Sequence, residues 1–351
     1  MAIVYDDSVL VTYMESATHV TPDRPVYLDA FLEDAIELDV DALCDTEECY
    51  VGSVLEHIEE CGIHSGDSAC CWPPFSLSEK IVDQIRAITK KLALACGIRG
   101  LLNIQYAVRD EHVFVIELNP RASRTVPFSS KATGVSLAKY ASRIMAGEKI
   151  SELRAQGLLP DENRTVDYYA VKEAVMPWSR FPGADSILGP EMKSTGEVMG
   201  IARTFPAAYA KTREAVENKL PEQGSVFISV CDRDKRAIAP VAMALENLGY
   251  GIYTTGGTAK TLRAAGIDCT TVNRISDGHP NVVDLMRDKT VSFIINTPHG
   301  HEAHSDGTKM RAEAVSQGIT CVTAMSAATA LIQALAAARK SEPETFALQD
   351  L

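Results

Sequence analysis

The chain has 351 residues, of which 46% are hydrophobic and 23% are charged, and its formal net charge at pH 7 is −13. This length can supply two domains with separate cores, and the composition is typical of a folded protein rather than a disordered one. The negative charge argues against a broad nucleic-acid-binding surface, so no nucleic-acid partner is expected.

No apolar run approaches the roughly 20 residues that a membrane helix needs, and the first residues lack the pattern of a signal peptide. The nine cysteines form no C-x-x-C pair, and their spacing matches no zinc finger. We therefore expect a cytoplasmic protein with free thiols and no membrane partner.

The first part of the chain is predicted to form an α+β unit. Residues 35–43 alternate apolar and acidic side chains, which is typical of a strand with one buried and one polar face. Three more strands are expected, at 48–57, 101–108 and 112–118. A helix is expected over 76–97, where apolar residues recur at helical spacing and Gly97 marks the end. Hairpin pairing of the last two strands indicates an antiparallel sheet.

Residues 177–206 are rich in proline, glycine and serine, so we expect ordered but irregular structure that belongs to the first domain. The polar stretch 217–223 is predicted to be a linker. The predicted domains are therefore residues 1–216 and 224–351.

After the linker, short apolar runs alternate with helical segments. The expected strands are 225–230, 251–255, 269–272, 291–296 and 319–322. The expected helices are 235–248, 258–265, 281–288, 304–317 and 325–339. This alternation predicts an α/β fold with a doubly wound parallel sheet, in which ligands bind beyond the carboxyl ends of the strands.

Polar side chains gather where the expected strand 112–118 ends. Glu117 and Asn119 are two residues apart in an extended chain, so they share a side, and oxygen ligands of this kind suit Mg²⁺. Arg121 and Arg124 follow and could bind phosphate or carboxylate oxygens. Gln105, on the partner strand, could add a third oxygen. The pattern is compatible with a metal–nucleotide site and also with a surface cluster of ion pairs.

The stretch that contains these residues, NIQYAVRDEHVFVIELNPRASRTVPFSSKATG, resembles the signature of the ATP-grasp superfamily and, more narrowly, the large chain of carbamoyl-phosphate synthetases. Further segments resemble that family in the same order: FLEDAIELDVDALCD, EHIEECGIHSGDSAC, YYAVKEAVMP and LGPEMKSTGEVMG. The resemblance is close over residues 1–215 and looser beyond them. It implies an α+β ATP-grasp portion followed by an α/β regulatory domain that is methylglyoxal-synthase-like (MGS-like).

The segments resemble the second ATP-grasp half of the family, which phosphorylates carbamate to carbamoyl phosphate for pyrimidine and arginine biosynthesis. The resemblance implies that Gln105, Glu117 and Asn119 bind Mg²⁺ or Mn²⁺ at the phosphates of ATP. It also implies that Arg121 and Arg124 hold carbamate and the transferred phosphoryl group.

The same resemblance implies further contacts with ATP. Glu37 falls at the ribose contact, and Ala30 and Leu32 line the adenine. Four residues correspond to the loop that borders the nucleotide: Gly62, Ile63, His64 and Ser65.

Four residues match the positions that hold the activator ornithine in bacterial members of the family: Glu59, Asp67, Glu173 and Thr323. An aromatic residue often lies two positions before that threonine, but here it is Cys321, which weighs against ornithine as the effector. A salt-bridging role for the acids is the alternative.

In the second domain, Thr255 and Thr258 flank two glycines where a helix begins, and backbone N–H groups and hydroxyls at a helix N-terminus favour phosphate. A plain turn and helix cap is the alternative. The family resemblance adds Lys235 and Arg274 and implies a nucleotide effector such as UMP or IMP. Arg274 stands where lysine is usual, and Pro298 where a hydroxyl residue is common.

The family's ATP site includes a glycine-rich loop that precedes these motifs, and no such loop occurs before Gly52. We therefore expect a C-terminal piece that is inactive without the remaining large-chain segments and the glutaminase small chain. Two alternatives remain open: a non-catalytic nucleotide-sensing regulatory module, and another ATP-grasp ligase such as a biotin-carboxylase-like enzyme.

Overall fold

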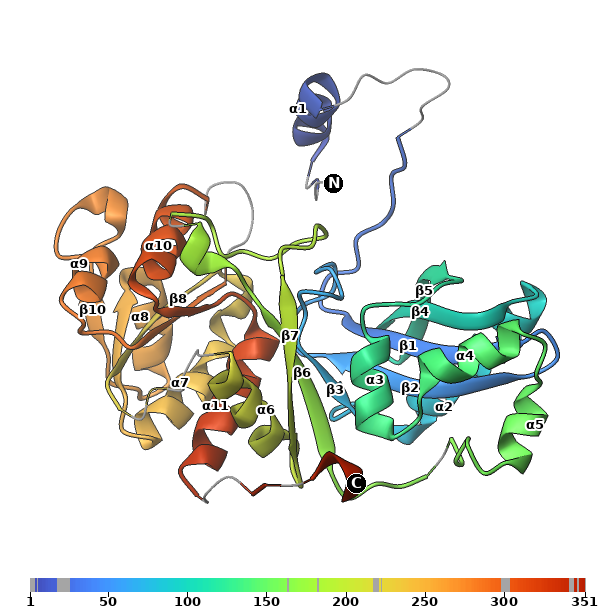
Figure 1. The fold of residues 1–351 in the computed structure, drawn as a ribbon. Helices are drawn as coiled ribbons and strands as arrows, with labels where there is room; N and C mark the ends of the chain where they lie inside the picture. Colours follow the sequence, from blue (N-terminus) through green and yellow to red (C-terminus); the bar gives the residue numbers. More distant parts are fainter. Residues whose placement is uncertain are drawn as a thin grey trace.

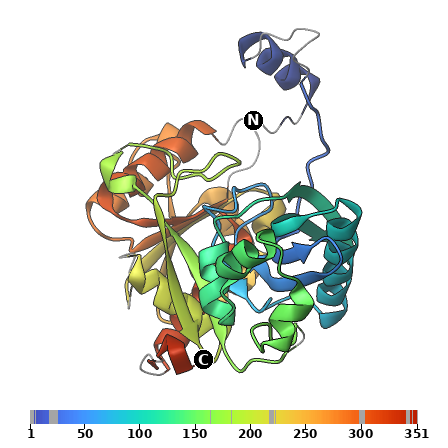
Figure 2. The ribbon, with the colours of Figure 1, turned by 45° about the vertical axis from the view of Figure 1, so that its right-hand side comes forward.

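The computed structural model describes the chain at residues 4, 6–17, 26–162, 164–181, 183–216, 221, 223–297, 304–340, 344–345 and 347–350. Two β-sheets lie side by side, each with helices against it, and the chain completes the first sheet before it enters the second (Figure 1). Helix α1 (Asp7–Ala17) lies apart from both sheets in Figures 1 and 2. No helix within the described ranges is both long and apolar enough to cross a membrane.

The first sheet has seven strands in the order β5-β4-β1-β2-β3-β6-β7, and every neighbouring pair is antiparallel. Its strands are β1 (Ile36–Asp45), β2 (Cys49–His57), β3 (Cys70–Trp72), β4 (Arg99–Arg109), β5 (His112–Asn119), β6 (Tyr169–Val175) and β7 (Gly196–Ala202). The β4–β5 hairpin turns at Asp110 and Glu111, whose φ angles are 50° and 62°, as a tight two-residue turn requires. The predicted α+β unit is confirmed.

Alternate residues of β1 divide the first sheet into two faces. Leu38 and Val40 pack with α2 (Glu79–Ala95), which buries Ile81 and Ile85 at helical spacing. The opposite face is covered by three shorter helices: α3 (Val126–Thr133), α4 (Leu137–Met145) and α5 (Ile150–Ala155). Both faces of β1 are therefore buried.

The segment 177–206 differs from its prediction. It contains the last strand of the first sheet, β7, which pairs with β6 from end to end. The glycines of this segment were the reason to predict an irregular structure, but Gly200 of β7 has a packing role. A Cβ at Gly200 would lie 2.4 Å from the carbonyl oxygen of Ala208 in α6 (Phe205–Ala215). The missing side chain lets the helix lie directly on the strand.

The second sheet has five parallel strands in the order β10-β9-β8-β11-β12. Its strands are β8 (Ser225–Val230), β9 (Gly251–Thr255), β10 (Thr270–Val272), β11 (Phe293–Thr297) and β12 (Thr320–Val322). The helices between and after them are α7 (Ile238–Asn247), α8 (Gly256–Ala264), α9 (Val282–Arg287), α10 (His304–Gln317) and α11 (Met325–Ala338). The predicted strands and helices all occur, so the doubly wound α/β fold is confirmed.

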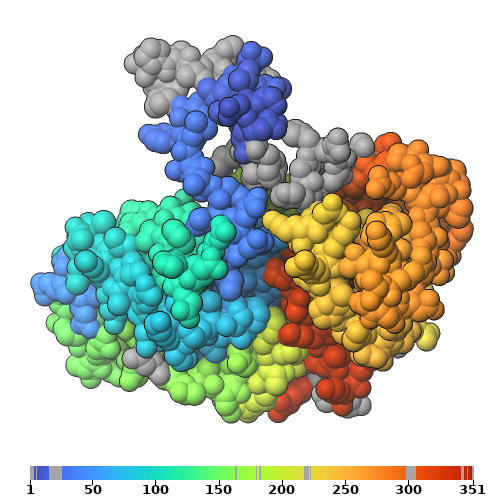
Figure 3. All heavy atoms as spheres, turned by 180° about the vertical axis from the view of Figure 1, so that it is seen from behind, coloured from blue at the N-terminus to red at the C-terminus, as the bar shows by residue number. Residues whose placement is uncertain are grey.

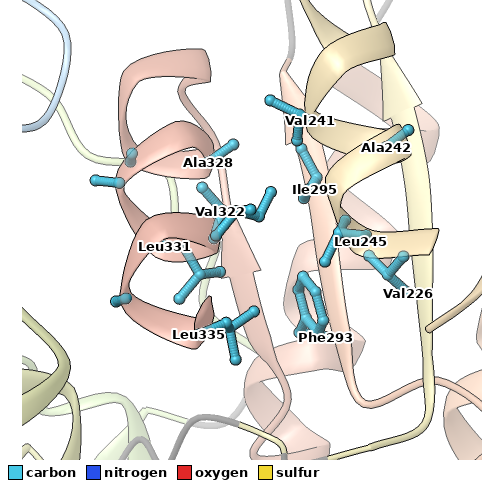
Figure 4. Packing of buried hydrophobic residues seen from close by; sticks show 14 of the residues in the cluster. Val226, Val241, Ala242, Leu245, Phe293, Ile295, Val322, Ala328, Leu331 and Leu335 are labelled. Carbon is cyan, nitrogen blue, oxygen red and sulfur yellow. The ribbon is translucent and has the colours of Figure 1, made fainter. Parts of the chain in front are cut away.

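Side chains of the second sheet alternate between its two faces. Val226 and Ile228 of β8 pack with Phe293 and Ile295 of β11 against α7 and α11, as Figure 4 shows for three of the four. Phe227 instead belongs to the core beneath α9 and α10. Apolar side chains on both faces are what a parallel sheet between two helical layers requires.

Helix α6 joins two regions of the molecule. The first region is the seven-stranded sheet with its helices, and the second region is the five-stranded sheet with its helices. Helix α6 packs against β6 and β7 on one side and against α11 on the other. One continuous hydrophobic cluster holds Phe205, Ala208 and Tyr209 of α6 together with Leu331 of α11. The two regions are in direct contact in the space-filling view of Figure 3.

Candidate nucleotide and metal site

The candidate metal ligands lie together on β4 and β5, at one edge of the first sheet. Gln105 and Glu117 are direct cross-strand partners, and the Asn119 side-chain nitrogen donates to the Glu117 carboxylate at 2.7 Å. Glu117 is exposed, whereas Gln105 and Asn119 are half-buried. The predicted geometry of these three residues is therefore confirmed, while their role as ligands stays a prediction.

Arg121 belongs to the same cluster. Its guanidinium donates to the Asn119 side-chain oxygen at 3.3 Å and to the Ala122 carbonyl at 3.0 Å. A tight turn holds it there, because the Arg121 backbone N–H donates to the Asn119 carbonyl at 2.8 Å. Arg124 follows on the exposed stretch that leads into α3.

The donor set suits a hard divalent cation that also binds phosphate. Gln105, Glu117 and Asn119 offer one carboxylate and two amide oxygens, and Mg²⁺ commonly takes one or two protein carboxylates together with water and substrate phosphate oxygens. Within the described part of the chain, no group of three or more His, Cys, Asp or Glu side chains is placed to hold a metal ion. A cation at this site would therefore depend on amide oxygens and on a nucleotide's phosphates.

Glu37 and the loop after β2 come together in the fold. The Gly62 backbone N–H donates to the Glu37 carboxylate at 2.9 Å. Phe31 lies over Gly62, where a Cβ would be 2.8 Å from the Phe31 ring. Ala30 is exposed next to Phe31 in the chain, and Leu32 is half-buried. The segments predicted to contact ribose and adenine thus meet at one place.

The environment of Glu37 is unusual for a strand carboxylate. Burial raises the pKa of the Glu37 carboxyl above its ordinary value, and the charge of His57 and the Gly62 hydrogen bond oppose that rise. The His57 ring Nδ1 lies 3.9 Å from the Glu37 carboxylate and is a buried nitrogen without a hydrogen-bond partner.

The polar face of β1 is as deeply buried as its apolar face, which the sequence did not indicate. Asp39 and Asp41 are both 0% exposed. His57 Nε2 shares a 2.8 Å hydrogen bond with Asp39, and the Asn103 side-chain nitrogen donates to Asp39 at 3.0 Å and to Asp41 at 3.1 Å. Burial alone would raise the pKa of Asp39, but the hydrogen bond and charge of His57 and the Asn103 bond together lower it.

Asp41 anchors the stretch of chain that carries Arg124. The hydroxyls of Ser123, Thr125 and Ser129 donate to its carboxylate at 2.7, 2.7 and 2.8 Å. Two of these residues flank Arg124 directly. Sequence reasoning missed this role, although the third acid in the alternation of residues 37–41 was a signal that the polar face continued past Glu37.

Lys172 is a second residue that sequence reasoning missed. It lies on β6 and is 1% exposed, and its ammonium donates to the Ser65 carbonyl at 2.9 Å. Strand pairing puts it on the same face as His57, through Cys70 of β3. A lysine in the middle of a strand is more often solvated, so its burial could not be anticipated. Lys172 fixes the backbone of the loop that borders the predicted nucleotide.

The acids predicted to bind ornithine already have protein partners. Glu173 accepts a hydrogen bond from the Thr212 hydroxyl at 2.9 Å and forms an ion pair with Arg213 of α6. Asp67 accepts two backbone N–H groups, from residues 193 and 194.

Glu59 lies beside this group. It accepts the Ala69 backbone N–H at 2.5 Å, and burial together with the nearby Glu173 charge raises the pKa of Glu59 to about 7. Thr323, the fourth predicted residue, is half-buried where β12 leads into α11.

Three of the predicted effector residues of the second region, Lys235, Thr255 and Thr258, lie at or near the start of α8. Lys235 is at the end of a 3₁₀ turn, η2 (Arg233–Lys235), and its ammonium would lie 3.4 Å from a Cβ at Gly257, at the start of α8. Thr258 is buried, and its hydroxyl accepts the Val230 backbone N–H at 3.4 Å. Arg274 is exposed, and Pro298 lies outside the described residues.

Two family models match the chain. The carbamoyl-phosphate synthase L chain ATP-binding domain matches residues 1–153, and the MGS-like domain matches residues 237–323. With the sheet architecture above, these matches define an ATP-binding region of the carbamoyl-phosphate synthase L chain type joined to an MGS-like domain.

Curated relatives identify the family more narrowly. Carbamoyl phosphate synthase large chains from Renibacterium salmoninarum and Corynebacterium glutamicum are each 48% identical over all of this chain, and that from Pseudomonas syringae pv. tomato is 47% identical. The chain belongs to the carbamoyl phosphate synthase large-chain family and corresponds to its C-terminal part. It covers 34%, 33% and 32% of those relatives, about a third of their length.

Among solved structures, a more distant match is found. The biotin carboxylase domain of a single-chain bacterial carboxylase is 16% identical, with a TM-score of 0.41, over 52% of this chain and 47% of its own.

Proposed function

We propose that this chain supplies the part of a carbamoyl phosphate synthase that phosphorylates carbamate with ATP. The observation that carries the proposal is the cluster of Gln105, Glu117 and Asn119 with Arg121 at its border. Strand pairing places this cluster on the same face of the sheet as Asp39, which is two residues from Glu37. A nucleotide that contacts Glu37 with its ribose would extend its phosphates along that face.

In this reaction a carbamate oxygen attacks the γ-phosphorus of ATP and the bond to ADP breaks, which yields carbamoyl phosphate and ADP. Such transfers depend on positioning and charge neutralisation rather than on covalent chemistry by the protein. Arg121 and Arg124 would bind oxygens of carbamate and of the transferred group. Asp41 would support Arg124 through the hydroxyls on either side of it.

Gln105, Glu117 and Asn119 would hold Mg²⁺ or Mn²⁺. When bound, such an ion supplies positive charge against the oxygens of the phosphates. Because these donors offer a single negative charge, Glu117 would contribute most of the electrostatic attraction.

The second region would bind a phosphorylated effector, UMP or IMP, near Lys235, Thr255, Thr258 and Arg274. Its support is the approach of the Lys235 ammonium to the glycines that open α8. Ornithine at Glu59, Asp67, Glu173 and Thr323 is a weaker proposal, because Arg213 already supplies a cation to Glu173. The partners would be the remaining large-chain segments and a glutaminase small chain, without which we expect this chain to be inactive.

The test is Glu117→Gln in an enzyme assembled with those partners. Formation of ATP from ADP and carbamoyl phosphate should fall by roughly 10²–10³-fold, the range for loss of one electrostatic contact to a reacting group. Bicarbonate-dependent ATP hydrolysis should be retained. Glu111→Gln, an exposed change in the turn between β4 and β5, should leave both reactions unchanged. Normal ATP formation in Glu117→Gln would remove the basis of the proposal.

A further inference from the structure

Residues 185–194, which we call the strap, lie between β6 and β7 in the chain, have no regular secondary structure and form hydrogen bonds with both regions. Asp185, at the start of the strap, accepts two hydrogen bonds from Arg311 of α10, at 2.5 Å from Nε and 2.7 Å from Nη2. The Thr308 hydroxyl adds a third at 3.1 Å. Arg311 is 0% exposed, and a fully buried guanidinium is strongly destabilising without a charged partner. This end of the strap is therefore firmly attached to the second region.

The other end of the strap is attached to the loop after β2. The Asp67 carboxylate accepts the backbone N–H groups of Lys193 and Ser194, both at 2.8 Å. In the middle, the His64 backbone N–H donates to the Gly189 carbonyl at 2.9 Å. Hydrogen bonds to charged groups, such as the pair at Asp67, are the stronger kind. The loop residues from His64 to Asp67 are thus held by the strap as well as by Lys172.

Beyond Arg311, the polar contacts continue into the second sheet. Arg311 Nη1 donates to the Asn296 side-chain oxygen at 3.0 Å, and the Asn296 side-chain nitrogen donates to the Ser229 carbonyl at 2.9 Å. The Ser229 hydroxyl lies 3.5 Å from the Thr255 hydroxyl, immediately before α8. The contacts therefore reach from the proposed phosphate site to the proposed nucleotide loop.

We propose that Arg311, acting through Asp185 and the strap, is a positioning residue for the loop His64–Asp67. The identity of the loop as a nucleotide contact rests on the proposed function above. The position of the loop does not rest on that proposal, because it follows from hydrogen bonds within the chain. The second region therefore helps to position a loop of the first region's site.

Hydrogen exchange on the full chain tests the positioning role. In Arg311→Gln, the amides of His64, Lys193 and Ser194 should exchange at least tenfold faster than in the wild type. Asp185→Asn is the second variant, because it removes the negative charge and one of the two acceptor oxygens from the partly exposed side and leaves the core residue in place. Arg287→Gln is the matched control, since Arg287 pairs with Glu313 of the same helix α10 at 3.1 Å but on the exposed surface. It should leave the three amides unchanged.

If Asp185→Asn keeps the circular dichroism spectrum of the wild type and these amides still exchange at the wild-type rate, the positioning role is wrong. Equal acceleration in Arg287→Gln would also contradict it.

Binding of ADP to the same proteins separates this inference from the proposed function. We expect Arg311→Gln and Asp185→Asn to weaken ADP binding about tenfold, with no change in Arg287→Gln. If the wild type binds no ADP, the assignment of the loop to a nucleotide fails, while the exchange rates still decide whether Arg311 holds the loop.

Discussion

The two sheets of this protein bury different kinds of side chain. The second sheet is filled on both faces by aliphatic and aromatic residues, such as Phe227 and Phe293. The first sheet has an apolar face beneath α2, but its other face buries Asp39, Asp41 and Lys172. A buried charge is costly unless it is paired and hydrogen-bonded. The buried charges of the first sheet can therefore position the residues of the candidate site. The second sheet instead derives its stability from apolar packing on both faces.

The largest effect is expected for Asp41→Ala. This change leaves the hydroxyls of Ser123, Thr125 and Ser129 without their shared acceptor, and removal of one member of a buried charged group typically costs about 3–5 kcal/mol. Urea unfolding followed by tryptophan fluorescence measures it, because both tryptophans, Trp72 and Trp178, lie in the first region.

The matched change in the second sheet is Thr254→Val. Thr254 is also 0% exposed, but its hydroxyl makes a single 3.3 Å contact with the Thr255 carbonyl. Its loss should cost about 1 kcal/mol. Equal costs for the two changes would show that the polar face of the first sheet has no special energetic role.

A smaller effect is expected where the two regions meet. Gly200→Ala places a Cβ 2.4 Å from the Ala208 carbonyl oxygen, which pushes α6 away from β7 and disturbs its packing on α11. Overpacking of this kind costs about 1–3 kcal/mol. Gly196→Ala on the same strand is the control, since its Cβ would lie 3.8 Å from the nearest atom. Circular dichroism during thermal unfolding should show the loss only for Gly200→Ala.

The smallest effect expected within the first region concerns pH. Because the pKa of Glu59 is raised to about 7 in the folded protein, the folded state binds a proton more tightly than the unfolded state. Stability should therefore fall as pH rises from the ordinary glutamate pKa toward 7, and stay lower above it. Glu59→Gln removes this loss while it keeps an acceptor for the Ala69 N–H.

We expect Glu59→Gln to raise the free energy of unfolding at pH 8 by about 1–2 kcal/mol, after allowance for partial exposure, and to leave it nearly unchanged at pH 5. Urea midpoints at the two pH values measure this difference. An equal gain at both pH values would mean that titration of Glu59 is not its cause.

The two regions also differ in how far the sequence predicted them. In the second region, every short apolar run became a strand, because a parallel sheet between helices needs apolar residues throughout and the pattern is local. In the first region, β7 was expected to be irregular. Gly200 of β7 is required because α6 packs directly on it. That packing between a strand and a helix does not appear in the spacing of apolar and polar residues along the strand.

The same distinction applies to the candidate site. Glu117 and Asn119 were expected to share a side, which follows from strand periodicity, and Gln105 was expected on the partner strand of the hairpin. The burial of Asp41 could not be predicted, because it depends on hydroxyls more than 80 residues away in the chain. Lys172 is a similar case, since its acceptor, Ser65, is 107 residues distant.

Strand β5, which carries Glu117, is the edge of its sheet. Phe114, Val115 and Ile116 along it are 40%, 46% and 49% exposed, so apolar groups face outward on both sides of the strand. An edge of this kind is a template for pairing with another chain. In concentrated solution the isolated chain should therefore self-associate edge to edge, and a lysine in place of Val115 should keep it monomeric.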